Sequence, residues 1–480
     1  YRRQRQMCIR DSTQVAIAGG GPVGVALSIA LSNMGIDNTV VERDTSIHPL
    51  PRAAVIDAEI VRAFIQMGLG DELMPQLSPI RVAEYVDVDG NRLAGEDLDG
   101  VRVFGGLSPS SMHYQPDLEA MLRREMLKRG GRFIEGARFT GIDSSSTDSV
   151  SLLMEDGSRL EADYVVGCDG ASSTVRRSLG IGWEDLGFNQ DWLVVDIEVN
   201  DRATCGLPDV ARQICDPRRP VTMIQGHERF HRWEFQLQPN EDPQVMNEVD
   251  NIWRLLSQWI TPAKARIVRS APYTFHAVVA STMRQGRVLL AGDAAHQMPP
   301  FMGQGLNSGH RDAINLAWKL SWVLKGWAGE NLLDTYSAER RTHALAIIEQ
   351  SVEAGQLIDQ FAGRVSHGIA PREGYGGSHR INGYGTGVVV GDHPRVGRPF
   401  RDWHEIVISL PVDDSMVIAS SVPVTTPLPV RGRWTLVQAG RKILFGADHV
   451  IVRPDGWVAA VCGDAELAQV LRELEGRLAV

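Results

Sequence analysis

A glycine-rich stretch in the second half of the chain constrains the fold more than any other feature. Four apolar residues, Val288-Leu-Leu-Ala291, predict a short buried strand. Asp293 then lies at the carboxyl end of that strand, where open α/β sheets bind their ligands. Gly303 and Gly305 follow, and apolar residues at spacings of three and four then predict a helix. Because such a loop presents free backbone N–H groups and the positive end of a helix dipole, it predicts a site for a polar tail and an electron-rich ring.

A dinucleotide-binding unit is predicted near the start of the chain. Gln14-Val-Ala-Ile-Ala18 is typical of a strand, Gly19-Gly-Gly-Pro-Val-Gly24 matches G-x-G-x-x-G, and an alanine- and leucine-rich helix follows. A second strand then ends in the acidic Glu42. In such a unit Gly21 lets the backbone approach a pyrophosphate, and Glu42 accepts hydrogen bonds from ribose hydroxyls. The alternative is a glycine-rich turn in an unrelated α/β fold.

Strands and helices continue to alternate up to residue 184. The apolar strand that ends near Gly167 delivers Asp169 into a Gly/Ser loop that opens a helix. Helices are predicted over 57–67 and from Gln115 to the glycine pair at 130–131. Short strands and turns are expected between residues 80 and 106, and a meander of strands over 132–143, 150–155 and 159–166.

The pattern changes to period two between Trp192 and Val279. Strands such as 192–199 and 230–237 surround one helix near 249–260, which predicts a β-rich layer inserted between two halves of the nucleotide unit. A long helix is expected over 332–361. The connection that follows lacks periodicity, and the tail from Trp434 predicts a strand, a turn, a further strand and a terminal helix.

Length, charge and cysteine content bound the class of protein. With 480 residues the chain exceeds one ordinary hydrophobic core, so two or three domains are expected. The net charge of −10 argues against nucleic acid or an anionic membrane as a partner. Five cysteines without metal-type spacing predict a reducing, cytoplasmic location, no structural disulfides and no metal site.

The first twelve residues need a separate interpretation. Residues 1–12 are polar and rich in arginine, and we interpret them as a non-native leader such as a translated cloning adaptor. A signal peptide is the alternative, because arginines precede the apolar run 15–36. That run contains Gly19-Gly20-Gly21-Pro22 in its interior, so we expect neither secretion nor a membrane span.

Three motifs stand together in a family-specific order: Gly19-x-Gly-x-x-Gly24 with Glu42, Cys168-Asp-Gly170, and Gly292-Asp-Ala-Ala-His296. Over residues 13–350 they resemble the single-component flavoprotein aromatic hydroxylases, the family of p-hydroxybenzoate hydroxylase and phenol hydroxylase. Further phrases are most similar to the 3-(3-hydroxyphenyl)propionate hydroxylases, namely Pro51-Arg52-Ala, Gly303-Gln-Gly-Leu-Asn-Ser-Gly, Arg311-Asp-Ala and Asn315-Leu-Ala-Trp-Lys319.

This resemblance implies an α/β fold with a Rossmann-like FAD-binding domain, an inserted β-rich substrate domain and a C-terminal degenerate thioredoxin-like domain. The FAD-binding domain would comprise residues 13–80, 113–184 and 286–362, and the substrate domain residues 81–112 and 185–285. Residues 363–399 would form a linker and 400–480 the thioredoxin-like domain. That tail has no C-x-x-C, so we expect no redox role for it.

The resemblance also assigns cofactor contacts. Gly19, Gly21 and Gly24 would contact the FAD pyrophosphate, and Glu42 the adenosine ribose, with Arg43 beside it. Arg52 and Gln115 would contact the phosphate and ribityl region, and Asp293 the ribityl hydroxyls. The edge of the isoalloxazine ring would lie along Pro300, Gly303, Gly305, Leu306 and Asn307. Asp169 is implicated in binding both FAD and NAD(P)H, and we expect the nicotinamide cofactor in a groove that includes Arg176 or Arg177.

The candidates for the substrate pocket and catalysis are His113, Tyr114 and His231. In strand 230–237, His231 shares one face with Trp233, Phe235 and Leu237, and one face could form the floor of the substrate site. The alternative is an ordinary half-buried sheet. Arg218 and Arg219 could bind a substrate carboxylate or form an exposed basic turn, and His296 is expected to be structural.

The leading hypothesis is an FAD-dependent monooxygenase that consumes NAD(P)H and O2 and hydroxylates a phenolic ring. By resemblance, the reaction would proceed through a flavin C4a-hydroperoxide on a substrate like 3-(3-hydroxyphenyl)propionate or 3-hydroxycinnamate. A helix N-terminus would favour the negative charge of a reduced flavin. The alternatives are a flavin dehydrogenase or reductase without oxygenation, and a catalytically silent flavin-binding sensor. We expect a monomer or homodimer whose only partners are small molecules.

Overall fold

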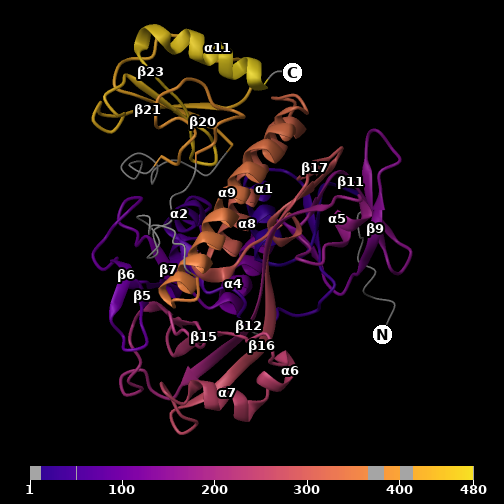
Figure 1. Cartoon of the computed structure of the whole chain (residues 1–480). Coiled ribbons are helices and arrows are strands. Elements are labelled where there is room, and N and C mark those ends of the chain that lie inside the picture. Colours follow the sequence, from indigo (N-terminus) through magenta and orange to yellow (C-terminus); the bar gives the residue numbers. More distant parts are fainter. Residues whose placement is uncertain (1–11, 50, 366–382, 401–413, 479–480) are drawn as a thin grey trace.

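The computed structural model describes residues 12–49, 51–365, 383–400 and 414–478. Figure 1 shows a sheet flanked by helices in the middle of the molecule, a second sheet below it and a small C-terminal unit above it. Residues 1–11 of the predicted leader and much of the predicted linker lie outside the described residues. Within the described ranges, no helix is both long and apolar enough to cross a membrane.

The first sheet is built around β1 (Ser12–Ala18), which pairs in parallel with β2 (Asn38–Val41) and with β11 (Arg159–Gly167). β11 pairs in parallel with β18 (Val288–Leu290), so segments far apart in the sequence lie side by side. These strands are apolar because a parallel sheet is covered on both faces. The carboxyl ends of β1, β11 and β18 meet at one edge, where the glycine motif, Asp169 and Asp293 follow them.

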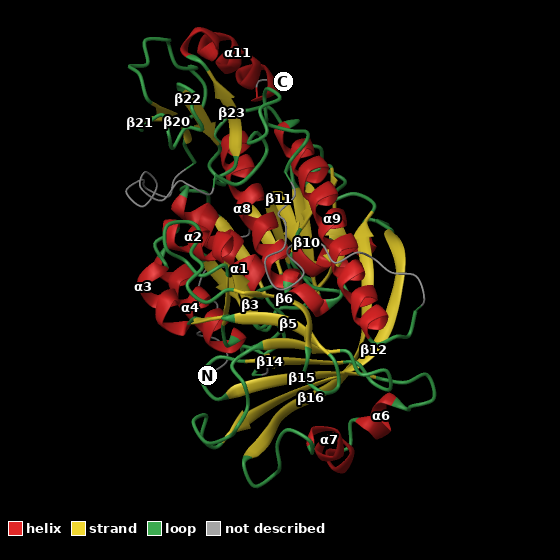
Figure 2. Ribbon diagram, turned by 60° about the vertical axis from the view of Figure 1, so that its left-hand side comes forward, coloured by secondary structure: helices red, strands yellow, loops and turns green. Residues whose placement is uncertain are grey.

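Helices α1 (Pro22–Asn33) and α8 (Gln304–Leu324) pack against each other over this sheet (Figure 2). The same unit contains α2 (Ala58–Gln66), α3 (Gly70–Leu73), α4 (Gln115–Lys128) and α5 (Thr174–Ser178). Its further strands are β8 (Arg132–Ile134), β9 (Phe139–Asp143), β10 (Val150–Met154) and β17 (Arg284–Gln285). A small separate sheet joins β3 (Val55–Asp57), β7 (Ser110–Met112) and β4 (Ser78–Pro79).

The second sheet is antiparallel except for one parallel pair, β5 with β13. Its long central strands, β12 (Trp183–Val199) and β16 (Ala265–Ala280), form the sheet with β15 (Phe230–Gln236), β14 (Val221–Gln225), β13 (Ala211–Ile214), β5 (Val82–Val86), β6 (Arg92–Asp97) and β19 (His296–Gln297). One face packs under α6 (Pro243–Met246) and α7 (Val249–Leu256), with Trp233, Phe235 and Leu256 in the core. The other face is turned toward the first unit (Figure 2).

The C-terminal unit has four strands in the order β21 (Trp434–Gln438), β20 (Met416–Ser420), β22 (His449–Val452) and β23 (Val458–Cys462), followed by α11 (Leu467–Leu478). β20 and β21 are parallel, and the other pairs are antiparallel. Trp318 and Trp322 of α8 are fully buried against Met416 and Ile418 of this sheet. The C-terminal unit therefore packs against α8 through a shared hydrophobic core.

The helix bounds expected from the sequence agree with the structure at α1, α2, α4 and α9 (Leu332–Phe361). The predicted strand over 132–143 was wrong: its first part is β8, which pairs with β2, and its second part is β9, which pairs with β10. β3, β13 and β20 were not expected. Ser12, the last residue of the predicted leader, belongs to β1 and pairs with Glu161 in the first sheet.

Candidate functional site

The glycine motif forms the turn between β1 and α1. Gly19 has a φ of +110°, and a Cβ added there would lie 2.4 Å from the carbonyl oxygen of Cys168. A Cβ on Gly24 would lie 2.1 Å from the carbonyl oxygen of Gly19. Gly21 differs, because its Cβ would meet nothing within 4 Å and no described side chain caps α1 there. The first and third glycines thus serve close packing, whereas Gly21 leaves the helix N-terminus open to an anion.

Glu42, directly after β2, closes the same turn. Its Oε2 accepts a hydrogen bond from the backbone N–H of Gly20 at 2.7 Å, and its Oε1 accepts one from Asp44 at 3.0 Å. An ionised carboxylate offers about four acceptor positions, so both oxygens can still accept ribose hydroxyls. Arg43 is exposed, with its Nε 3.8 Å from a carboxylate oxygen of Asp44.

Arg123 of α4 is a residue of this site that sequence analysis missed. Its guanidinium donates to the carbonyl oxygen of Gly20 at 3.1 Å and lies 4.8 Å from the centre of the Phe133 ring. This places a positive charge beside the open N-terminus of α1, where it favours a phosphate group. The available signal was weak: a single arginine two helical turns after Gln115.

The loop that carries Arg52 is held from two sides. The backbone N–H groups of Arg52 and of the next residue donate to Oε1 of Gln115 at 2.9 and 2.6 Å. Arg232 and Arg269, from the second sheet, donate to the carbonyl oxygen of Pro51 at 3.0 and 2.9 Å. The side chain of Arg52 remains 55% exposed. Gln115 therefore positions Arg52 through its backbone and leaves the guanidinium available.

Asp293 stands in the single turn Gly292–Ala294 after β18. Its side chain reaches solvent although protein surrounds it, and this crowding raises the pKa of the carboxyl. The charges of His296 and Arg52 act in the opposite direction. An accessible carboxylate near an accessible guanidinium, at the carboxyl end of a parallel strand, suits the hydroxyls of a sugar-like chain.

The start of α8 is fixed to β3. Gly303 caps the helix with a φ of +65°, and a Cβ there would lie 2.9 Å from Cβ of Val55. Asn307 accepts from the N–H of Asp57 at 2.9 Å and donates to the carbonyl oxygen of Gly303 at 2.8 Å. Gly305 faces open space, with nothing within 4 Å of an added Cβ. Leu306, the next residue, packs partly against the core of the first unit. The first turn of α8 is therefore held rigidly, and the space beside Gly305 is open.

Asp169 is used within its own loop. Its Oδ1 accepts from the hydroxyl of Ser173 at 2.6 Å, and its Oδ2 accepts from the N–H groups of Thr174 and Val175 at 2.6 and 3.1 Å. These bonds fix the start of α5 beside Gly19. The carboxylate of Asp169 thus shapes the loop, and a direct cofactor contact would have to share these oxygens.

Of the two arginines expected near the nicotinamide cofactor, only one is accessible. Arg176 is 8% exposed, donates to the carbonyl oxygen of Ile181 at 2.8 Å and stacks 4.0 Å from the ring centre of Trp183. These contacts leave it no freedom to bind a ligand, so the suggestion of Arg176 was wrong. Arg177 is exposed.

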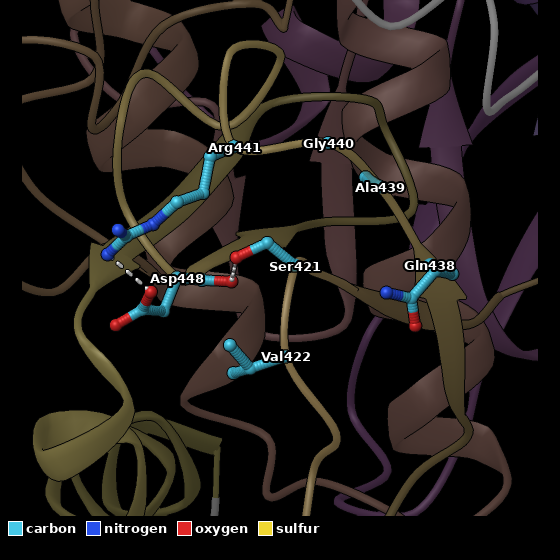
Figure 3. A pocket seen from close by; sticks show the side chains of 7 residues that line it. All are labelled: Ser421, Val422, Gln438, Ala439, Gly440, Arg441 and Asp448. Carbon is cyan, nitrogen blue, oxygen red and sulfur yellow. Dashed lines mark hydrogen bonds and ion pairs between the residues drawn. The ribbon is translucent and has the colours of Figure 1, made fainter.

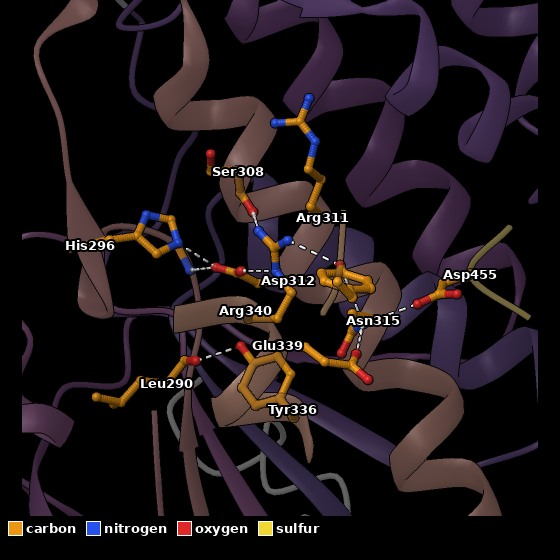
Figure 4. A network of polar contacts seen from close by, with 12 residues as sticks. Leu290, His296, Ser308, Arg311, Asp312, Asn315, Tyr336, Glu339, Arg340 and Asp455 are labelled. Carbon is orange, nitrogen blue, oxygen red and sulfur yellow. Dashed lines mark hydrogen bonds and ion pairs between the residues drawn. The ribbon is translucent and has the colours of Figure 1, made fainter. Parts of the chain in front are cut away.

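A buried polar network lies beneath the Asp293 turn (Figure 4). Asp312 accepts hydrogen bonds from the N–H of Gly292 at 2.9 Å and from Nε of Arg340 at 2.7 Å, and pairs with Nε2 of His296 at 2.7 Å. Burial raises the pKa of the Asp312 carboxyl, but the charges of His296 and Arg340 outweigh it, so the pKa lies below its usual value. His296 therefore has the structural position expected of it.

A cavity of about 80 Å³ lies between the start of α8 and the second sheet. One wall is the loop Pro300-Phe-Met-Gly303, and the facing wall is formed by β5, β13 and β14. The residues on that wall include the ion pair of Glu84 and Arg212 as well as Gln213, Thr222 and Ile224. Phe301 is surrounded by further rings, because it makes edge contacts with Trp192, Phe188 and Phe275. The cavity thus adjoins the residues assigned to the isoalloxazine edge and is mainly apolar.

None of the three predicted catalytic residues lines this cavity. His231 pairs with Gln225 and shares the α7 face with Trp233, whereas Thr222 and Ile224 are on the opposite face. Tyr114 stacks on Phe230 with ring centres 4.5 Å apart. His113 is buried, and burial is the main cause that lowers its pKa to about 3. His231, Tyr114 and His113 thus lie outside the lining of this cavity.

The basic turn is also excluded from the cavity. Arg219 forms an ion pair with Glu241 and donates to the carbonyl oxygen of Gln236 at 2.8 Å. Arg218 is 86% exposed and pairs with Asp216 at 3.0 Å. The suggestion that these arginines bind a substrate carboxylate was therefore wrong, since both are turned to local acidic partners.

A wider hollow lies in the C-terminal unit (Figure 3). It is lined by Ser421 and Val422 after β20, by Gln438 at the end of β21, and by Arg441 and Asp448. The guanidinium of Arg441 pairs with Asp448 at 2.7 Å, so its charge is compensated. Nothing in the described residues indicates a metal site, here or elsewhere.

The residues of the first unit fit FAD. Gly21 and Gly305 leave space over two helix N-termini, Glu42 retains acceptor capacity, and Arg52 and Asp293 are accessible. The two N-termini favour negative charge at both ends of a long ligand: a pyrophosphate at α1 and a reduced ring at α8.

Comparison with known proteins agrees with this geometry. A family model described as "FAD binding domain" matches residues 12–351. A probable NADH-specific resorcinol 4-hydroxylase of Rhodococcus jostii (strain RHA1) is 39% identical over 353 residues, which is 72% of this chain and 66% of that protein. A 3-(3-hydroxy-phenyl)propionate/3-hydroxycinnamic acid hydroxylase of Klebsiella pneumoniae is 38% identical over 373 residues, 76% of this chain and 66% of that protein. The aligned part thus spans just under two thirds of these relatives' length.

Solved structures resemble the chain over nearly its whole length. An aklavinone-11 hydroxylase in complex with FAD and aklavinone has a TM-score of 0.79 at 24% identity and covers 97% of this chain and 99% of its own. The flavin-dependent monooxygenase PieE, in complex with FAD and substrate, has a TM-score of 0.80 at 20% identity with the same coverage. At these identities the likeness shows a common fold.

Proposed function

The chain belongs to the FAD-binding-domain family, and from that premise we propose that it is a monooxygenase that hydroxylates a phenolic ring with NAD(P)H and O2. The observation that carries the proposal is the cavity shared by the two units. Its wall Pro300–Gly303 leads directly into the open N-terminus of α8, and its other wall is the second sheet. A ring bound there would lie beside Pro300 and Gly303, which are assigned to the edge of the isoalloxazine ring.

Residues of the chain would bind the flavin and the phenolic ring, orient them and exclude water from the cavity. When bound, FAD supplies hydride acceptance and oxygen activation. The N-terminus of α8 stabilises negative charge on a reduced ring, because the helix dipole is positive at that end. Phe301 and the aromatic rings around it keep water from the cavity, as oxygen transfer to an aromatic ring requires.

The nicotinamide cofactor is proposed to bind transiently. There is no second G-x-G-x-x-G unit after residue 170. Arg177, exposed on α5 near the Asp169 loop, is the remaining candidate for a contact with it. NADH is the favoured cofactor because the Rhodococcus relative is described as NADH-specific.

We further propose that the three units of the chain have the domain roles that the family resemblance implies. The first unit would be the FAD-binding domain and the second sheet the substrate domain. Strand order β21-β20-β22-β23 with a parallel β20/β21 pair and a terminal helix supports a thioredoxin-like C-terminal domain. We also propose that the protein is cytoplasmic and that it is a monomer or a homodimer.

The test is NADH oxidation by the purified holoenzyme with and without phenols, with oxygen and product measured together. Phenol-stimulated oxidation that yields a hydroxylated ring supports the proposal. Turnover that persists without oxygen and yields no hydroxylated ring indicates a flavin dehydrogenase or reductase. Absence of turnover with bound FAD indicates a silent flavin-binding sensor.

A further inference from the structure

We infer that Arg232 and Arg269 of the second sheet are positioning residues for FAD, because they hold the loop that presents Arg52 to the cofactor. This loop, residues 51–53, is called the Arg52 loop below. The positioning role rests on the proposed function, in which the Arg52 guanidinium contacts bound FAD. The unit proposed to bind the substrate then also controls how firmly the cofactor is held.

The strand register brings three buried charges together on the second sheet. Asp196 of β12 lies opposite Arg232 of β15 and opposite Arg269 of β16, and the three strands lie side by side in Figure 2. The side chains of the aspartate and the two arginines are 6%, 8% and 4% exposed. Asp196 accepts hydrogen bonds from Arg232 at 2.7 and 3.1 Å and from Arg269 at 3.2 Å. These three residues form the Asp196 cluster.

The Asp196 cluster has two guanidinium charges but only one carboxylate. Arg232 donates from Nη1 to the carbonyl oxygen of Arg52 at 2.8 Å and from Nη2 to that of Pro51 at 3.0 Å. Arg269 donates from Nη1 to the same oxygen of Pro51 at 2.9 Å. Because a buried guanidinium needs partners for its N–H groups, the carbonyl groups of the Arg52 loop supply what Asp196 alone does not.

Two other groups lie near these arginines, and neither replaces the loop. The hydroxyl of Tyr273 accepts a hydrogen bond from Nη2 of Arg269 but carries no charge to balance it. The charge of Glu234 acts on both arginines, yet burial raises the pKa of its carboxyl to about 7. At neutral pH this carboxyl is therefore only about half ionised. The loop carbonyls thus remain necessary partners of the Asp196 cluster.

Gln115 holds the N–H side of the same peptide groups. Its Oε1 accepts from the N–H of Arg52 at 2.9 Å and from that of Ala53 at 2.6 Å, and its Nε2 donates to Glu119 at 2.6 Å. The first unit therefore holds the loop by its N–H groups, and the second unit holds it by its carbonyl groups. The side chain of Arg52 is left 55% exposed, with its Nη2 4.0 Å from Oε1 of Glu119.

A loop that is already held favours cofactor binding. Surface loops are normally mobile, and a ligand that orders one loses binding free energy in doing so. The charge of Arg52 acts on the carboxyl of Asp293, so the fixed loop sets these two accessible groups for one ligand. Without Arg232 the carbonyl side of the loop loses two of the three hydrogen bonds that the arginines donate to it. FAD then has to order the loop itself and dissociates faster.

The test follows FAD release from diluted holoenzyme at pH 7 by the rise in flavin fluorescence. Arg232→Met is expected to speed release by about 10-fold, because the loop loses two hydrogen bonds from a charged donor. Arg232→Lys keeps the charge beside Asp196 and can donate to one loop carbonyl. Its rate of release should therefore lie between those of Arg232→Met and the wild type.

Arg219→Met is the matched control in the same unit. Arg219 is 19% exposed, forms an ion pair with Glu241 and donates to the carbonyl oxygen of Gln236, so it also joins a carboxylate to a backbone carbonyl. Its printed partners do not include the Arg52 loop. The rate of FAD release from Arg219→Met should stay within about 2-fold of the wild-type rate.

A double-mutant cycle with Arg52→Met separates positioning from a general structural role. If Arg232 acts through Arg52, Arg232→Met should change FAD release by less than about 2-fold once Arg52 is replaced. The positioning role is overturned if the two effects multiply, or if either single variant releases FAD at the wild-type rate. If melting shows that Arg232→Met does not fold, the same cycle with Arg232→Lys decides.

Failure of the positioning role and failure of the proposed function give different results. If a phenol is hydroxylated with NADH and O2 but the effects of Arg52→Met and Arg232→Met multiply, only the positioning role fails. If FAD release follows the cycle and no phenol is hydroxylated, the proposed function fails.

Discussion

At the scale of single residues, Glu234 makes a direct prediction about stability. Burial is the main cause that raises the pKa of its carboxyl to about 7, although Arg232 and Arg269 oppose it. Between about pH 4.5 and 7 the folded protein therefore keeps a proton that the unfolded chain has lost, so this group's contribution to stability falls as the pH rises through that window. Glu234→Gln should remove the cost of ionisation and increase the free energy of unfolding by about 1–3 kcal/mol at pH 8.

The measurement is the melting temperature of wild type and Glu234→Gln from pH 4.5 to 8.5. The two curves should lie close together at pH 4.5, diverge between about pH 4.5 and 7, and stay apart above pH 7, with the variant higher. The prediction is contradicted if the melting temperature of Glu234→Gln, relative to wild type at the same pH, is lower at pH 8 than at pH 5. That result would show that its arginines hold Glu234 as a carboxylate.

Residue roles were the part of the site least accessible to sequence analysis. The glycines could be identified because backbone geometry requires them at fixed spacing. Period two predicts that a strand has two faces, but not which face meets the cavity, and His231 lies on the face under α7. Gln213 and Thr222 were missed since their strands are short and carry no motif.

At the scale of elements, the glycines of the turn between β1 and α1 have different roles: Gly24 is needed for folding and Gly21 for cofactor binding. Gly21→Ala adds a methyl group to open space, so the protein should fold with a near-normal melting temperature but lose FAD affinity by about 10-fold or more, since the methyl group meets the pyrophosphate. Gly24→Ala places a Cβ 2.1 Å from the carbonyl oxygen of Gly19 and should destabilise the fold itself.

The flavin content of the two purified variants and the thermal melting of their apoproteins check this pair. The account is contradicted if Gly21→Ala binds FAD like wild type, or if Gly24→Ala melts like wild type. Gly35→Ala is a useful reference for strain alone, because Gly35 has a φ of +75° but lies at the far end of α1.

The elements themselves were largely predictable. The helices α4 and α9 were found with nearly their observed bounds, and α4 was marked by Pro116 and Asp117 at its start and by a glycine pair after its end. β8 was merged with β9 because both are short and close together in the sequence, and the parallel pairing of β8 with β2 distinguishes them. Pairing between distant segments is a tertiary property, and local sequence does not contain it.

At the scale of the whole molecule, a clamp of buried charges joins the C-terminal unit to α9. Arg453 donates to both carboxylate oxygens of Glu339 at 2.9 and 2.8 Å and to Asp455 at 2.5 Å. Lys319 donates to the same glutamate at 2.8 Å. Adjacent to Glu339, Arg340 holds Asp312 beneath the Asp293 turn, so one helix links the C-terminal unit to the proposed flavin site (Figure 4).

Removing one partner of this clamp should be costly. Arg453→Met leaves Glu339 buried with less compensation and is expected to lower the free energy of unfolding by about 3–5 kcal/mol. Arg441→Met, which breaks an exposed ion pair in the same unit, should cost at most about 1 kcal/mol. Thermal melting compares the two, and equal melting temperatures would mean that the clamp does not stabilise the protein.

The central claim is that the two large units together form a site in which a flavin oxygenates a phenolic ring. Its most direct test is a stoichiometry: NADH consumed, O2 consumed and hydroxylated product formed, measured in reactions of the holoenzyme with a small panel of phenols. The account predicts that at least one phenol stimulates NADH oxidation and that for this phenol the three quantities agree one to one. NADH oxidation that is unaffected by phenols, or that consumes O2 without forming a hydroxylated ring, would contradict it.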